Sequence, residues 1–231
     1  MKADTFAKLV VLEALIDAEI GHYLEHPPSS MELFREGMVS RVGDLVDEID
    51  ALDAVAAARI YDAIVDFLAE MPDNDEGVID VTLRFRRAMD RLVERGMDQR
   101  DLKQASTWAI VLDELLEELA LEYHAAIRAD GEIWERPYMR TQTLLARARE
   151  AADRLLWEAD EEWHAKLRSD MDRLTFAIRH QRLKPAAVDL LIQAPQRRAS
   201  RYRPSTLTRI GAFVVGQVLR RSNRPSKARG T

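Results

Sequence analysis

The sequence predicts an all-α protein, built as a multi-helix antiparallel bundle or as an elongated helical array. Long stretches rich in Ala, Leu, Glu and Arg favour helices, because these residues have high helix propensity. The nine glycines and eight prolines cluster at a few places, where they separate these stretches. In the first stretch, apolar residues recur at the three- and four-residue spacing of one helix face.

The first helices are delimited by a proline pair and a capping sequence. Apolar periodicity predicts a helix over about 4–26, and the two prolines that follow end it. Ser29 and Glu32 then have the spacing of a capping box, which begins a second helix. Asp53 is a candidate cap for a third helix over 54–71, and the alternative is that the second and third helices form one long rod.

Turn residues delimit the next two helices. Residues 72–77 combine Pro, Asn, Asp and Gly and predict a loop. The helix predicted over 79–95 ends at Gly96, a residue type common just beyond helix C-termini. Asp98 is the expected cap of a further helix that runs to about residue 128.

The longest predicted element follows a turn near 129–137, where the body has a candidate subdivision. Pro137 suits the first turn of a helix, and no further Pro or Gly interrupts the chain before residue 184. We therefore expect one very long helix over about 138–183, with a break near Asp170 as the alternative. Such a length is typical of an antiparallel arm or of coiled-coil-like packing.

Composition narrows the class of protein. The 231 residues are 47% hydrophobic and 32% charged, which is enough to build a globular body with a substantial core. The chain is cysteine-free, so disulfides and thiolate chemistry are excluded. Glu13 and Asp17 interrupt the first apolar run, which argues against a secretory signal, and no run is long enough to span a membrane. We expect a soluble, cytoplasmic protein that is at most peripheral to a membrane.

Charge is distributed unevenly along the chain. Residues 1–183 contain 23 Lys+Arg and 39 Asp+Glu, a net charge of −16, whereas residues 184–231 contain 11 Lys+Arg and one acid, a net charge of +10. We therefore distinguish an acidic helical body over 1–183 from a basic C-terminal segment over 184–231. This segment includes a short apolar stretch over 206–219. Basic residues at this density indicate an anionic partner.

The basic C-terminal segment supplies the main candidate interaction residues. Arginines interleaved with a tyrosine suit single-stranded nucleic acid, and they equally suit an anionic membrane. The apolar stretch bracketed by arginines favours a membrane interface or a protein partner over nucleic acid. The alternative is that this stretch packs on the acidic body. The candidates are Arg197, Arg198, Arg201, Tyr202, Arg203, Phe213, Val214, Val218, Arg220 and Arg221.

The body offers two weaker candidate interaction surfaces. One is an arginine face on the helix predicted over 79–95, formed by Arg84, Arg87, Arg91 and Arg95. It could bind phosphates, although ion pairing with acids of the next helix is the more common role of such a face. The other is Trp157, which lies outside the apolar stripe of its helix, and tryptophan is a frequent interface anchor.

The alternative to an interaction surface on the body is a metal site inside it. Two Glu-x-x-His pairs, Glu19/His22 and Glu161/His164, have the spacing used by di-iron and di-manganese helical bundles. Helical periodicity argues against this site, because His22 and Glu161 point away from the apolar stripes of their helices. Glu13, which lies within the apolar stripe of its helix, is the one residue that still favours a metal site; the alternative is a boundary position whose carboxylate reaches solvent.

These features predict a non-enzymatic adaptor or assembly subunit with a helical body and a docking C-terminal segment. We expect a protein partner, in a homo- or hetero-oligomer, with an anionic membrane as the second choice and nucleic acid as the third. No catalytic motif, cofactor or small-molecule substrate is indicated. The alternatives are a helical-bundle di-metal enzyme that uses the Glu-x-x-His pairs and a nucleic-acid-binding regulator.

Overall fold

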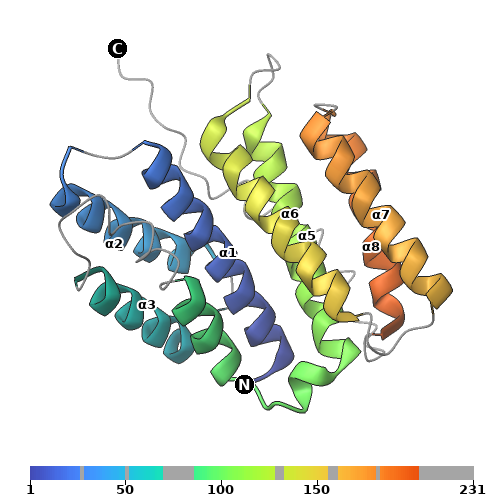
Figure 1. The fold of residues 1–231 in the computed structure, drawn as a ribbon, viewed down its shortest axis with the longest axis horizontal. Helices are drawn as coiled ribbons and strands as arrows, with labels where there is room; N and C mark the ends of the chain where they lie inside the picture. The colour runs from blue at the N-terminus through green and yellow to red at the C-terminus, as the bar shows by residue number, and fades with distance from the viewer. Residues whose placement is uncertain are drawn as a thin grey trace.

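The described chain is helical throughout, and the all-α prediction is confirmed (Figure 1). The computed structural model describes residues 1–26, 29–49, 52–69, 86–127, 133–155, 161–180 and 183–202. Within these ranges, the one extended feature is an isolated antiparallel bridge between Ile127 and Ile133. Among the same residues, no helix has both the length and the apolar character needed to cross a membrane.

Three helices form the centre of the molecule: α1 (Ala3–Glu25), α5 (Ala105–Ala126) and α6 (Glu135–Leu155). The α5–α6 pair makes the most extensive contact of the fold, and α1 packs against both helices (Figure 1). All three contribute buried apolar side chains to one continuous core, because each carries an apolar face wider than a single stripe.

Two groups of helices flank this centre. On one side lie α2 (Met31–Glu48), α3 (Ala54–Ala69) and a helical segment over residues 86–95; on the other lie α7 (Glu161–His180) and α8 (Pro185–Ala199). Short 3-10 turns, η1 (Asp101–Lys103) and η2 (Ser200–Tyr202), precede α5 and follow α8. Figure 1 shows the resulting elongated array, with α1, α5 and α6 between the two flanking groups.

Helix capping separates α2 from α3. Ser30, one residue later than predicted, caps α2 by accepting a hydrogen bond from the Leu33 amide at 3.2 Å. Asp53 accepts hydrogen bonds from the amides of Val55 and Ala56, at 3.1 and 2.9 Å, and so caps the start of α3. The two helices are therefore separate and pack against each other, which decides between the two alternatives left open by the sequence.

The prediction of one very long helix over 138–183 is wrong. The Tyr138 hydroxyl donates to the Ile178 carbonyl at 3.3 Å, and Arg149 lies 2.9 Å from Asp172 in an ion pair. In a straight helix, residues 138 and 178 would be about 60 Å apart. The chain therefore reverses direction between α6 and α7. The reversal lets α6 pack on α1 and α5 while α7 packs on α8, so that both apolar faces are buried.

Helix α8 continues through a proline, Pro195. Pro195 lies inside α8, where it lacks the amide hydrogen that the helix would use. Contacts beyond the proline hold the last turn in place: Arg198 pairs with Asp170, and the Tyr202 ring packs edge-on against Trp163 at 4.8 Å between centroids. The first part of the basic C-terminal segment is thus packed on the body.

Candidate functional site

Opposite charges line the interface between α1 and α6. The two helices run antiparallel, and a guanidinium nitrogen of Arg147 donates to Glu13 at 2.8 Å, while Nε of Arg140 donates to Glu19 at 2.7 Å. Both acids are buried, with exposed fractions of 6% for Glu13 and 0% for Glu19. Buried carboxylates are stable only when they are paired or neutralised, so this interface depends on its arginines.

Three helices meet at the Glu19 carboxylate, and a fourth is joined to them through Arg140. Arg140 and Arg136 of α6 both donate to it, the latter through Nε at 2.8 Å, and Nε of Arg41 on α2 lies 3.6 Å away. Arg140 also reaches Glu122 of α5 at 3.2 Å. We call Glu19, Arg41, Glu122, Arg136 and Arg140 the central ionic cluster. It places oppositely charged groups at the junction of α1, α2, α5 and α6.

A second polar site surrounds Glu13. A cavity of about 40 Å³ lies here, lined among others by Asp90, Trp108, Arg147 and Arg154. Burial raises the pKa of Glu13 to about 9, and its hydrogen bond with Asp90 raises it further. Burial alone would also raise the pKa of Asp90, but the hydrogen bond from Glu13 and the charge of Arg147 lower it below its ordinary value. At neutral pH, Glu13 is therefore protonated and donates to the Asp90 carboxylate.

The size of the Glu13 cavity decides what it could bind. A volume of about 40 Å³ has room for a water molecule. Pockets for organic ligands usually measure about 300–1,000 Å³. The cavity beside Glu13 and Asp90 is thus too small for an organic substrate. The hydrogen bond between the two acids therefore has a structural role.

The predicted Glu-x-x-His pairs are not brought together in the described structure. The carboxylate of Glu19 is occupied by arginines of the central ionic cluster, and His22 follows one turn later on α1. Glu161 and His164 lie on the first turn of α7, where Glu161 is exposed and His164 half-buried. Among the described residues, the four side chains do not form a group within metal-ligand distance of one another.

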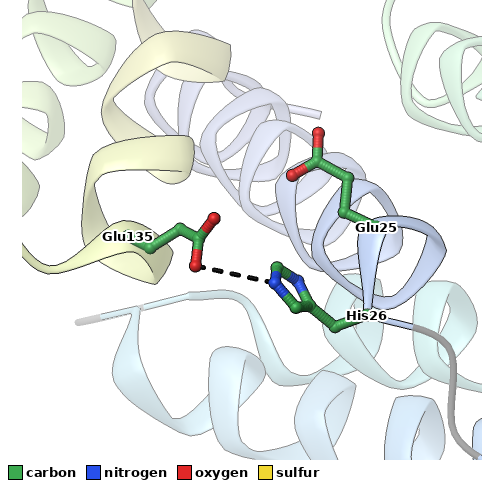
Figure 2. Close-up of side chains that lie close together, drawn as sticks. All are labelled: Glu25, His26 and Glu135. Atoms are coloured by element: carbon green, nitrogen blue, oxygen red, sulfur yellow. Dashed lines mark ion pairs between the residues drawn. The ribbon is translucent and has the colours of Figure 1, made fainter.

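A different group of side chains does come within that distance. Glu25 and His26 at the end of α1 and Glu135 at the start of α6 hold their ligand atoms within 4.8 Å of one another. Figure 2 shows Glu135 directed toward the His26 ring, with an ion pair of 3.7 Å between the carboxylate and Nε2. We call these three residues the α1–α6 end cluster. This cluster was not predictable from the sequence, because Glu135 lies about 110 residues after Glu25 and His26.

The structure describes three of the four residues of the predicted arginine face. Arg84 lies outside the described residues, whereas Arg87, Arg91 and Arg95 are exposed on the helical segment over residues 86–95. Between described residues, this segment forms ion pairs through Arg86 with Asp17 of α1, through Asp90 with Arg147 and through Glu94 with Arg154. The face itself remains a candidate anion-binding surface.

The predicted C-terminal candidates divide at residue 202. Arg197 donates to Gln193 at 2.9 Å, while Arg198 and Tyr202 contact α7 and Arg201 is exposed. The other candidates lie outside the described residues, as does Trp157; they are Arg203, Phe213, Val214, Val218, Arg220 and Arg221.

An open groove lies between α7 and α8. It encloses about 610 Å³ and is lined by Arg168, Asp172, Phe176 and Leu191 among others. Phe176 is 55% exposed, and Leu190 of α8 is 67% exposed. Large apolar side chains at such exposure are typical of contact surfaces when they are grouped. The groove was not predictable from the sequence, because it depends on how α8 packs against α7.

Comparisons with known proteins do not assign this chain to a family. No family model matches this chain, and neither a curated protein nor a solved structure matches it. No activity is therefore transferred from another protein. The function has to be argued from the chain's own charges, cavities and exposed surfaces.

Proposed function

We propose that this chain is a non-enzymatic adaptor or assembly subunit whose C-terminal arm docks on another molecule. The observation that carries the proposal is the separation of charge at the end of the described body. Residues 1–202 contain 27 Lys+Arg and 40 Asp+Glu, whereas residues 203–231 contain seven Lys+Arg and no acid. We call residues 203–231 the C-terminal arm. Its net charge of +7 favours an anionic contact surface, by ordinary electrostatic complementarity.

The sequence of the C-terminal arm favours a surface that is both anionic and apolar. The stretch over 206–219 is mostly apolar and is flanked by Arg203 on one side and by Arg220 and Arg221 on the other. Basic residues next to an anionic surface are worth about 1 kcal/mol each, and apolar side chains add to the binding when they are buried. A nucleic-acid backbone would use the arginines alone, so the composition supports a membrane or protein surface.

The anchored end of α8 supports the same proposal. Arg198 and Tyr202 hold the chain on α7 immediately before the C-terminal arm begins. The arm is therefore joined to the body at a fixed point, as expected for a docking element. The groove between α7 and α8 lies on the same two helices and offers the exposed Phe176 for protein contacts.

Deletion of the C-terminal arm tests the proposal. Full-length protein and a variant ending at Tyr202 are mixed with vesicles of phosphatidylcholine, with and without phosphatidylserine, and separated by flotation. We expect the full-length chain to bind the anionic vesicles and the shortened chain to lose that binding with an unchanged melting temperature. Equal binding by both chains refutes the proposal. A large fall in melting temperature also refutes it, because the arm would then be part of the folded core.

A matched variant distinguishes a surface that binds the apolar stretch of the arm from a nucleic acid that binds only its positive charges. Phe213→Ser, Val214→Ser and Val218→Ser together remove apolar surface and keep all seven positive charges. We expect this variant to lose vesicle binding. If it instead keeps full binding to a single-stranded oligonucleotide, with a steep dependence on salt, the arm is a nucleic-acid-binding element and the proposed surface is wrong.

A further inference from the structure

We infer that the α1–α6 end cluster, Glu25, His26 and Glu135, is a binding site for one zinc ion. The three side chains converge from two helices that are adjacent in space and far apart in sequence (Figure 2). The site is separate from the Glu-x-x-His pairs and from the C-terminal arm. It stands independently of the adaptor function proposed above.

The donor set suits zinc. One imidazole nitrogen and two carboxylate oxygens are ligands that Zn²⁺ accepts, and three protein ligands with a water in the fourth position are common in its open sites. Imidazole favours zinc over the hard cation Mg²⁺, which prefers oxygen and retains its water. Mn²⁺ accepts the same donors but binds more weakly in the usual order of divalent metals.

The distances are close to those that a tetrahedral ion requires. Zinc bonds of about 2.0 Å at tetrahedral angles place neighbouring ligand atoms roughly 3.3 Å apart. The Nε2 atom of His26 lies 3.7 Å from Oε2 of Glu135, and all three ligand atoms lie within 4.8 Å of one another. Movements of about 1 Å or less per side chain would close the site. All three side chains are exposed and so have room for such movements.

The orientation of His26 suits a metal ligand. Its Nδ1 lies 3.3 Å from the backbone carbonyl of His22, and its Nε2 lies 3.7 Å from the Glu135 carboxylate. A histidine that turns one ring nitrogen to a carbonyl and the other to the metal is the usual arrangement at metal centres. Nε2 is therefore the ring nitrogen placed to bind the ion.

A zinc ion at this cluster would connect the end of α1 to the start of α6. Glu25 and His26 form the last turn and cap of α1, and Glu135 lies in the first turn of α6. One ion would join these two helix ends directly. Because zinc would bind the folded arrangement in preference to the unfolded chain, its binding raises the melting temperature of the protein.

Titration of the metal-free full chain with zinc chloride tests the site. By isothermal titration calorimetry, we expect one equivalent of zinc to bind, and we expect His26→Ala and Glu135→Gln each to weaken the affinity at least tenfold. The matched control is His180→Ala, since His180 is an exposed histidine at the end of α7. We expect this control to bind as the unaltered chain does.

Thermal unfolding supplies an independent measurement. The His26–Glu135 ion pair is exposed, so neither variant should change the melting temperature without metal. With zinc, the melting temperature of the unaltered chain should rise, and that of His26→Ala should not. The inference is overturned if no saturable one-site binding occurs, or if His26→Ala and His180→Ala reduce the affinity equally, because the zinc would then be adventitious.

Discussion

Replacement of Glu19 by glutamine tests whether the central ionic cluster holds the helices together. Glutamine keeps the shape of the side chain and removes its charge, so packing is preserved while the arginines lose their shared anion. Arg140 is the partner most affected, since it is 7% exposed and cannot turn into solvent. Arg136 has a side chain that is 40% exposed and can regain water.

The expected loss of stability depends on which acidic partners each arginine keeps after Glu19 is replaced. Removal of one partner from a buried ion pair costs about 3–5 kcal/mol. Arg140 keeps Glu122 at 3.2 Å, and Arg41 keeps Glu48 at 3.2 Å, so the loss should fall at the lower end of that range. We expect Glu19→Gln to lower the free energy of unfolding by about 3 kcal/mol. For a chain of this length, that corresponds to a fall in melting temperature of roughly 6–12 °C.

Urea unfolding followed by circular dichroism measures this change at fixed pH and salt. The matched control is Glu162→Gln, which removes an exposed pair with Lys166 one turn along α7 and should cost less than about 0.5 kcal/mol. A double variant, Glu19→Gln with Arg140→Gln, should cost less than the sum of the two single changes. A loss for Glu19→Gln no larger than that of the control would refute the reasoning.

Two further predictions concern the Glu13 site and the glycines of α2. Because burial raises the pKa of Glu13 from 4.5 to about 9, the folded chain holds a proton that the unfolded chain releases, so stability falls as the pH rises through this range. Glu13→Gln should flatten that slope, which is at most about 1.4 kcal/mol per pH unit, in urea unfolding series at several pH values. Gly43→Ala should raise the melting temperature by a few degrees, since a methyl group there meets Tyr61 at an ordinary 3.8 Å and alanine stabilises helices by about 0.5–1 kcal/mol. Gly37→Ala should lack this gain or destabilise the protein, because the same methyl group would lie 2.6 Å from the Tyr23 hydroxyl; an equal gain at both sites contradicts the packing described for Tyr23.

Local signals predicted the helices where strong breakers occur. The proline pair after the first helix and the cap at Asp53 both mark helix boundaries in the structure. The reversal between α6 and α7 could not be predicted in this way, because the sequence between them contains neither proline nor glycine. It is imposed by the burial of the two helices against different partners. Conversely, Pro195 has a strong local signal that contacts of Arg198 and Tyr202 override.

The partners of the buried acids were not predictable from local patterns. The position of Glu13 in the apolar stripe of the first helix indicated a metal ligand or a boundary residue, whereas the structure buries this side chain against Arg147. Its partner Arg147, like the partner Arg140 of Glu19, lies more than 100 residues away. Spacing along one chain carries no information about such a pairing. The one sequence feature that could have indicated these pairs is the row of arginines on α6, Arg136, Arg140 and Arg147, which lies on the same side as the buried apolar residues of that helix.

The central place of α1 has a consequence for synthesis of the chain. The helix buries 12 of its 23 residues, but most of its cover comes from α5 and α6, which end about 100 and 130 residues later. At a translation rate of about 5–20 residues per second, α1 waits roughly 5–25 s for these partners. During that interval its apolar face is exposed and can associate with other chains. Glu19 lies on this face and keeps it hydrated until the arginines of α6 arrive, so the acid that forms ion pairs in the finished protein also protects its first helix during translation.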